Sequence, residues 1–122
     1  MRSKLQAEKT GRIKVSPKDE RTLDGIAFAS KSEMKRYAEL KLLERVGTIK
    51  MLVRQPKFIL QESFIHPVFG KQREISYIAD FEYYENGRCV VEDVKGMKTE
   101  VYKLKRKLFL ARYPEIDFRE VK

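Results

Sequence analysis

The chain has 122 residues, of which 42% are hydrophobic and 37% charged, and it carries a net charge of +9. This length favours one domain, and the composition is typical of a globular protein with a strongly charged surface. One cysteine and one histidine exclude an internal disulfide and a multi-cysteine zinc site. No apolar run is long enough to span a membrane and no secretory signal is found, so we expect a cytoplasmic protein.

The excess of basic residues favours a polyanionic partner. Lys and Arg total 27 against 18 Asp and Glu. Such a surface attracts nucleic acid, although it also serves solubility alone. An anionic membrane is the weaker expectation, because no predicted helix sets a clean apolar face opposite a basic one.

The chain is expected to begin with an arm and continue as one domain. Residues 1–21 are basic and show little apolar periodicity, which predicts a segment that is mobile or orders on a partner. The domain covers residues 22–122. It opens with a small hairpin turning at Asp24-Gly25. A helix follows, with Ser30 as a suitable N-cap and Gly47 placed to end it.

The rest of the domain is predicted as strands and a second helix. The expected strands cover residues 49–53, 58–61, 74–85, 88–95 and 116–121. Asn86-Gly87 is the strongest hairpin signal, and it joins the third of these strands to the fourth. A loop containing His66 separates the second from the third. The second helix is expected to begin at the N-cap Thr99 and to end at Tyr113, before a proline.

Acidic and basic side chains converge where two predicted strands meet. Residues two apart in a strand point the same way, so Asp93 and Lys95 share a face, with the backbone of Val94 between them. Asp80 lies on the preceding strand, across the hairpin turn. Two carboxylates and the Val94 carbonyl make a hard oxygen site suited to Mg²⁺ or Mn²⁺. A structural ion pair between Asp93 and Lys95 is the competing interpretation.

Two neighbouring acids have alternative roles. Glu92 faces away from Asp93 in a regular strand, but a bulge would exchange the two as ligands. Glu33 stands three residues after Ser30, as in a capping box. Its position on the helix also leans towards the sheet, where it would support a metal ion. From the residues alone, the capping role is the favoured one.

The second helix carries a basic face that is a candidate for DNA binding. Lys103, Arg106 and Lys107 share this face, and Lys98 stands just before the helix. Such residues contact phosphates without reading sequence, although an ordinary solvated face has the same pattern. The apolar residues of this helix share another face: Val101, Leu104, Leu108 and Ala111.

Four segments, taken in order, resemble a family of small phage and prophage proteins. These segments are Ser30-Lys31-Ser32-Glu33, Gln55-Pro56-Lys57-Phe58, Tyr77-Ile78-Ala79-Asp80-Phe81 and Val91-Glu92-Asp93-Val94-Lys95-Gly96. That family is assigned to the PD-(D/E)XK nuclease superfamily, which includes restriction endonucleases and some Holliday-junction resolvases. The resemblance covers residues 22–121. No proline precedes Asp80, a departure that the superfamily tolerates.

The resemblance implies a fold, an activity and a set of site residues. The fold is a restriction-endonuclease-like α-β-β-β-α-β core, an α/β class with a mixed central sheet flanked by helices. The activity is Mg²⁺-dependent endonuclease cleavage of DNA, with Mn²⁺ able to substitute. Asp80 and Asp93 would bind the metal, Lys95 would be the catalytic lysine, and Glu33 would become a site residue.

The resemblance also implies a setting for this activity. The leading expectation is a phage recombination nuclease for branched DNA, acting as a homodimer in the cytoplasm of a bacterial host. This substrate assignment rests on family analogy, which is a weak argument for substrate. The alternative is a non-catalytic nucleic-acid-binding protein that keeps the nuclease fold.

Overall fold

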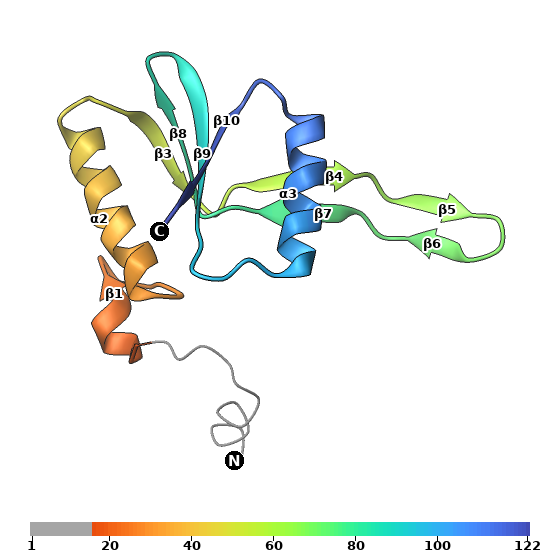
Figure 1. Ribbon diagram of the computed structural model, residues 1–122, viewed down its shortest axis with the longest axis horizontal. Coiled ribbons are helices and arrows are strands. Elements are labelled where there is room, and N and C mark those ends of the chain that lie inside the picture. The colour runs from red at the N-terminus through yellow and green to blue at the C-terminus, as the bar shows by residue number, and fades with distance from the viewer. Residues whose placement is uncertain (1–15) are drawn as a thin grey trace. The chain divides into compact units, whose positions relative to one another are not determined.

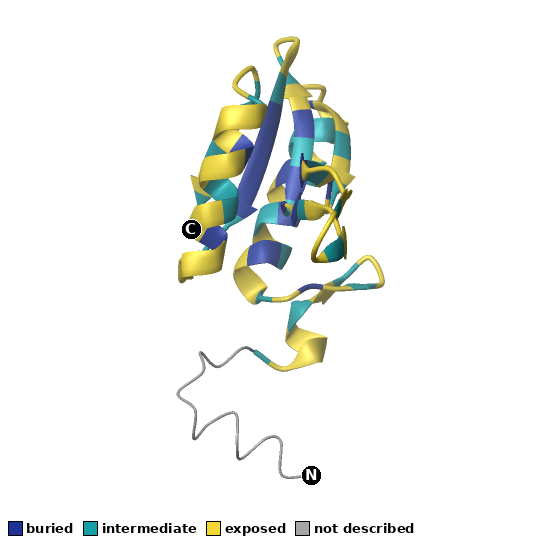
Figure 2. Ribbon diagram, turned by 90° about the vertical axis from the view of Figure 1, so that its right-hand side faces the viewer, coloured by how far each residue is buried: buried dark blue, intermediate teal, exposed yellow. Residues whose placement is uncertain are grey.

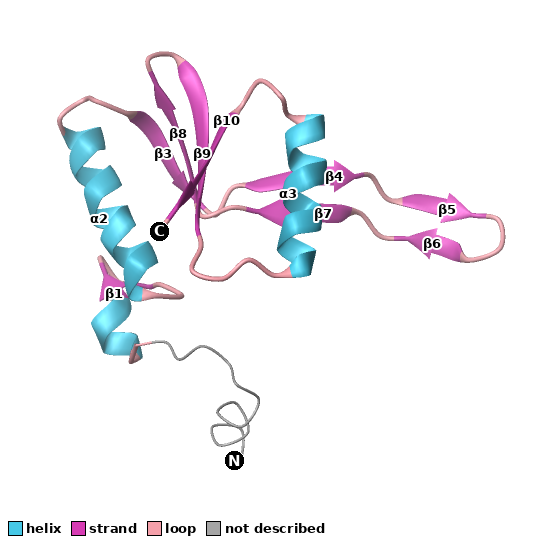
Figure 3. Cartoon of the chain, in the orientation of Figure 1, coloured by secondary structure: helices cyan, strands magenta, loops and turns pink. Residues whose placement is uncertain are grey.

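The computed structural model describes residues 16–122, so most of the arm predicted for residues 1–21 lies outside the described part. The last residues of this arm form η1, a short 3-10 helix over Lys18–Arg21. The described residues divide into two compact units, with the boundary between Ala38 and Glu39, inside the first α-helix. Helices and strands are both present, as predicted (Figure 3). No helix in the described residues is long and apolar enough to cross a membrane.

The first unit contains the predicted small hairpin and the start of the first helix. β1 (Thr22–Leu23) pairs antiparallel with β2 (Ile26–Ala27) around the expected turn. α2 (Lys31–Arg45) follows, and the Oγ of Ser30 accepts a hydrogen bond from the backbone N–H of Glu33 at 3.1 Å. A helix leaves its first N–H groups without partners, so this contact confirms the predicted N-cap.

The second unit is built on a four-stranded mixed sheet. Its strands, in spatial order, are β10 (Asp117–Val121), β9 (Arg88–Val94), β8 (Phe81–Glu85) and β3 (Lys50–Arg54). β8 and β9 form the hairpin predicted at Asn86-Gly87, whereas β10 runs parallel to β9. Two parallel neighbours need a long crossover connection, and α3 (Glu100–Arg112) supplies it.

Two further strand pairs lie in the chain between β3 and β8 and are not part of the four-stranded sheet. β4 (Lys57–Gln61) pairs with β7 (Ile75–Ile78), and β5 (Phe64–His66) pairs with β6 (Gly70–Gln72). Figure 1 shows them extending away from the four-stranded sheet. The β5–β6 hairpin corrects the loop predicted around His66. The Nδ1 of this histidine accepts hydrogen bonds from two backbone N–H groups of the turn, at 3.0 and 3.1 Å, and so closes it.

The prediction of a single strand over residues 74–85 is wrong, because the strand is interrupted at Asp80. β7 ends two residues before this aspartate, and β8 begins directly after it. A second break lies opposite, where Gln55 adopts a φ of 52° and Pro56 has no N–H to donate. The backbone N–H of Gln55 donates to the carbonyl of Asp80 at 2.9 Å. The two interruptions therefore lie side by side, and together they form a corner at which both chain segments turn.

Aromatic side chains form the core beneath α3. The buried residues of this helix are Tyr102 and Phe109, which pack in one cluster with Tyr77. The predicted apolar face points to solvent instead, with Val101 64% and Leu104 60% exposed. Figure 2 shows the buried run of β9 in dark blue, the strand that carries the candidate site.

Replacing Gly87 with alanine is expected to destabilise the protein. Gly87 has a φ of +77°, and a Cβ added there meets nothing within 4 Å, so the cost comes from the backbone conformation alone. We expect the free energy of unfolding in urea to fall by about 1–2 kcal/mol. The control is Gly96→Ala, at an equally open position without a positive φ. An equal loss in both variants would contradict this interpretation.

Candidate active site

The Asp93 carboxylate is buried, and two side chains compensate its charge. Asp93 is 1% exposed on β9. The Tyr77 hydroxyl donates a hydrogen bond to its Oδ2, and the Lys95 Nζ lies 3.3 Å from its Oδ1. A buried charge is costly unless it is paired and hydrogen-bonded, and here both oxygens have partners. Asp93 and Lys95 therefore share one face of the strand end, as predicted from their spacing.

Tyr77 is a member of this site that the sequence did not reveal. Burial raises the pKa of its phenol, and the hydrogen bond to Asp93 raises the pKa further. The hydroxyl therefore stays protonated at neutral pH and keeps donating to Asp93. Tyr77 lies on β7, sixteen residues before Asp93, and only the corner in the chain brings the two together.

Asp80 is fixed by backbone groups on both sides. Its N–H donates to the carbonyl of Glu92 at 3.1 Å, and its carbonyl accepts from Gln55 at 2.9 Å. Its Oδ2 accepts a hydrogen bond from the backbone N–H of Val94 at 2.6 Å. Continuing the β8–β9 register by one residue brings Asp80 opposite Asp93. The group of Val94 that the structure places at this carboxylate is its N–H, and ligation by its carbonyl stays a prediction.

Lys95 is the basic member of the cluster. Its side chain is 30% exposed, so the ammonium group reaches solvent while it contacts Asp93. The Lys95 Nζ also lies 4.5 Å from the ring centre of Tyr102, where a cation is attracted to the aromatic face. These two contacts fix the Lys95 ammonium between Asp93 on β9 and Tyr102 on α3.

Glu92 belongs to a different environment. It is fully buried, and its Oε2 accepts a hydrogen bond from the Tyr83 hydroxyl, whereas Asp93 contacts Tyr77. Consecutive strand residues point to opposite faces, so the structure places Glu92 on the other side of the sheet from Asp93. This supports Asp93 as the carboxylate of the candidate site.

Glu33 lies in the other compact unit. It is in the first turn of α2 and is 6% exposed, and its backbone N–H donates a hydrogen bond to the Oγ of Ser30. The structure thus brings Asp80, Asp93 and Lys95 together in the second unit, and a role for Glu33 in the site stays a prediction.

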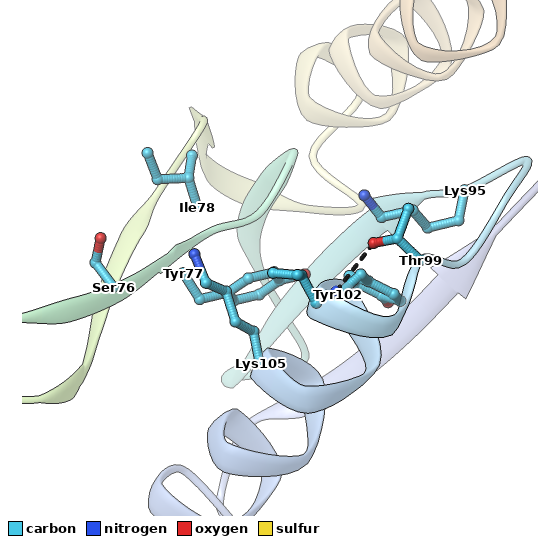
Figure 4. A pocket seen from close by; sticks show the side chains of 8 residues that line it. Ser76, Tyr77, Ile78, Lys95, Thr99, Tyr102 and Lys105 are labelled. Atoms are coloured by element: carbon cyan, nitrogen blue, oxygen red, sulfur yellow. Dashed lines mark hydrogen bonds between the residues drawn. The ribbon is translucent and has the colours of Figure 1, made fainter. Parts of the chain in front are cut away.

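A cavity of about 310 Å³ opens beside Lys95, between β7 and the first turns of α3. Its polar lining includes Lys95, Lys105, Ser76 and Thr99. Figure 4 shows the side chains of Lys95 and Lys105 on either side of those of Tyr77 and Tyr102. The candidate carboxylate site therefore borders a basic cavity.

The predicted DNA-binding residues of α3 are mostly paired with acids. Arg106 and Lys98 lie 2.5 and 3.8 Å from Glu120, and Lys103 lies 3.4 Å from Glu100. Lys107, the remaining predicted residue, has no ion pair among the described residues, and neither has Lys105, which was not predicted to bind DNA. Lys105 was missed in the sequence because it stands off the basic face of the helical projection.

The protein groups at this site supply only some of the oxygen ligands that a magnesium ion needs. Within residues 16–122, no three side chains among His, Cys, Asp and Glu form a metal-binding group. Mg²⁺ characteristically uses one or two carboxylates and completes its shell with water and substrate phosphate. The carboxylates of Asp80 and Asp93 meet that requirement, provided that Lys95 releases the oxygen it now contacts.

The fold and this site define a mixed α/β protein with a buried acid–lysine cluster beside a basic cavity. A family model described as "Protein of unknown function (DUF1064)" matches residues 12–122. The chain therefore belongs to this family. No curated protein matches the chain.

The ion-pair cluster around Glu120 predicts a loss of stability in acid. Burial raises the pKa of Glu120, but hydrogen bonds from Tyr102 and Arg106 outweigh it and hold the pKa below its usual range. A lowered folded-state pKa stabilises the protein above the unfolded pKa of about 4.3, and this contribution is lost as the pH falls below it.

The test compares the wild type with Glu120→Gln by urea unfolding at several pH values. The difference in unfolding free energy should be largest near neutral pH and should shrink below pH of about 4. A difference that does not change with pH would contradict the role of the ionised carboxylate.

Proposed function

We propose that the protein is a metal-dependent endonuclease that hydrolyses phosphodiester bonds in DNA. The observation that carries this proposal is the cluster at the end of β9, where Asp80, Asp93 and Lys95 lie together although Asp80 comes from the break between β7 and β8. A buried carboxylate held beside a lysine at the mouth of a basic cavity is the arrangement that such a reaction needs.

The element order supports a restriction-endonuclease-like core as part of this proposal. Leaving out η1 and the three separate two-stranded sheets (β1–β2, β4–β7 and β5–β6), the order is α2, β3, β8, β9, α3 and β10. This is the α-β-β-β-α-β order implied by the sequence resemblance. The aspartates fall on the second and third of these core strands or directly beside them.

Each residue of the cluster has a distinct task in the proposed reaction. Asp80 and Asp93 would hold Mg²⁺ or Mn²⁺, which when bound stabilises charge on the phosphate and lowers the pKa of water. Tyr77 keeps the Asp93 carboxylate oriented through its hydrogen bond. Lys95 is placed to exchange its contact with Asp93 for one with the attacking water or the phosphate.

DNA is the proposed substrate because the chain is strongly basic. The net charge of +9 favours a polyanion, and Lys105 and Lys107 offer unpaired charge on α3 within the described residues. Cleavage of branched DNA, a homodimeric state and a phage setting in a bacterial cytoplasm are further expectations from the resemblance.

A second candidate is a nucleic-acid-binding protein without catalysis. The observation favouring it is that both oxygens of Asp93 already have protein partners, Tyr77 and Lys95. A complete ion pair of this kind is able to serve stability alone. Such a protein would bind DNA equally well with and without divalent ions.

Asp93→Asn is expected to abolish cleavage. The substitution keeps the size of the side chain and removes the charge that would bind the metal, so the rate should fall by about 10³-fold or more. Binding to DNA should persist or improve, because repulsion of the phosphate is relieved. The measurement is nicking of supercoiled plasmid in Mg²⁺, Mn²⁺ and EDTA, beside linear duplex, single strand and a four-way junction.

The matched control is Glu92→Gln. It changes an equally buried acid on the same strand, whose partner is Tyr83 on the other face. This variant should cut in the presence of Mg²⁺. Wild-type cutting by Asp93→Asn would contradict the assignment. DNA binding without cutting by the wild-type protein in any of these ions would favour the second candidate.

A further inference from the structure

We propose that the cavity beside Lys95 binds one unpaired nucleotide of the substrate strand. The inference rests on the proposed nuclease function, and it names the kind of DNA that this function selects. The nucleotide's phosphate would lie between Lys95 and Lys105, and its base would lie against the apolar rim of the cavity.

The charges of the lining favour a phosphate. Lys95, which follows the end of β9, and Lys105, on α3, both line the cavity, and the Lys95 ammonium is at the same time 3.3 Å from the Asp93 carboxylate. No Asp or Glu is among the residues that line the cavity. In the described part of the chain Lys105 has no ion pair, unlike Arg106 beside it. An ammonium that no carboxylate neutralises is available to a bound anion.

The remaining walls favour a base and a sugar. Ile78 is 57% exposed and Val101 is 64% exposed, and both stand at the cavity on opposite elements, β7 and α3. Apolar surface left in water on two facing walls gains free energy when a flat apolar face covers it. The hydroxyl of Ser76 adds a polar group that is able to bind a sugar or base edge.

The size and shape of the cavity favour an unpaired nucleotide over a duplex. About 310 Å³ is at the lower end of small-molecule sites, which suits a single nucleotide. A base within a duplex keeps both faces stacked and cannot offer one to a protein wall. The proposed substrate is therefore DNA with an unpaired nucleotide next to the bond that is cut, as in a single strand, a flap or a branch.

The test measures binding of the full chain to fluorescent oligonucleotides without divalent ions, so that cleavage does not intervene. A single strand of thymidines is compared with a duplex of equal length and with a strand of abasic sites. We expect Lys105→Met to weaken single-strand binding by about tenfold, as for loss of one charge-assisted hydrogen bond. The control Lys107→Met removes the same charge from the same helix and should cost only about twofold.

The base contact has its own readouts. The abasic strand should bind about tenfold more weakly than the thymidine strand. In a titration with thymidine 5′-monophosphate, methyl NMR signals of Ile78 and Val101 should shift, whereas those of Val53, on a different strand, should not.

Three results would overturn the proposal: equal losses in Lys105→Met and Lys107→Met, equal binding of abasic and thymidine strands, or a duplex bound as tightly as the single strand. Each is distinguishable from failure of the nuclease assignment. Metal-dependent cutting with no role for Lys105 would leave the nuclease and remove the nucleotide site. Single-strand binding through Lys105 in a protein that never cuts would support the nucleotide site and contradict the nuclease assignment.

Discussion

The burial of the Asp93 carboxylate is the constraint on which the candidate site depends. A charge with 1% exposure would destabilise the fold without compensation. Tyr77 and Lys95 supply that compensation from two different elements, and Tyr102 holds Lys95 in turn. The stability of the core and the position of the reactive groups therefore depend on the same contacts. Removing Lys95 alone is therefore expected to cost more stability than replacing both members of the Asp93–Lys95 pair with apolar residues, because the Asp93 charge would stay buried without its ion-pair partner.

The corner in the chain is the structural device that assembles this cluster. A straight strand through residues 74–85 would have carried β7 along the same sheet as β8. The breaks at Gln55 and Asp80 instead turn β4 and β7 away, and Tyr77 comes to contact Asp93. The same turn opens the space between β7 and α3 that forms the basic cavity. The same corner thus determines the positions of the carboxylates and the shape of the surface that would bind a substrate.

Sequence reasoning succeeded where the signal was local. The Asn86-Gly87 turn and the Thr99 cap are fixed by chemistry within a few residues, and both are present. The break at Asp80 was missed because it depends on a partner strand about 25 residues away in the chain. The contact of Tyr77 with the site was missed for the same reason. Lys105 was missed because periodicity places residues on a helix face but does not tell which neighbour that face meets.

The proposed nuclease requires Asp80 and Asp93 to bind one divalent metal ion together. The most direct test is a crystal structure of the protein soaked in Mn²⁺, with the ion located by its anomalous scattering. We expect a Mn²⁺ about 2.1 Å from carboxylate oxygens of both aspartates, with the Lys95 ammonium moved off Asp93. The absence of anomalous density there, with Lys95 still paired to Asp93, would contradict it.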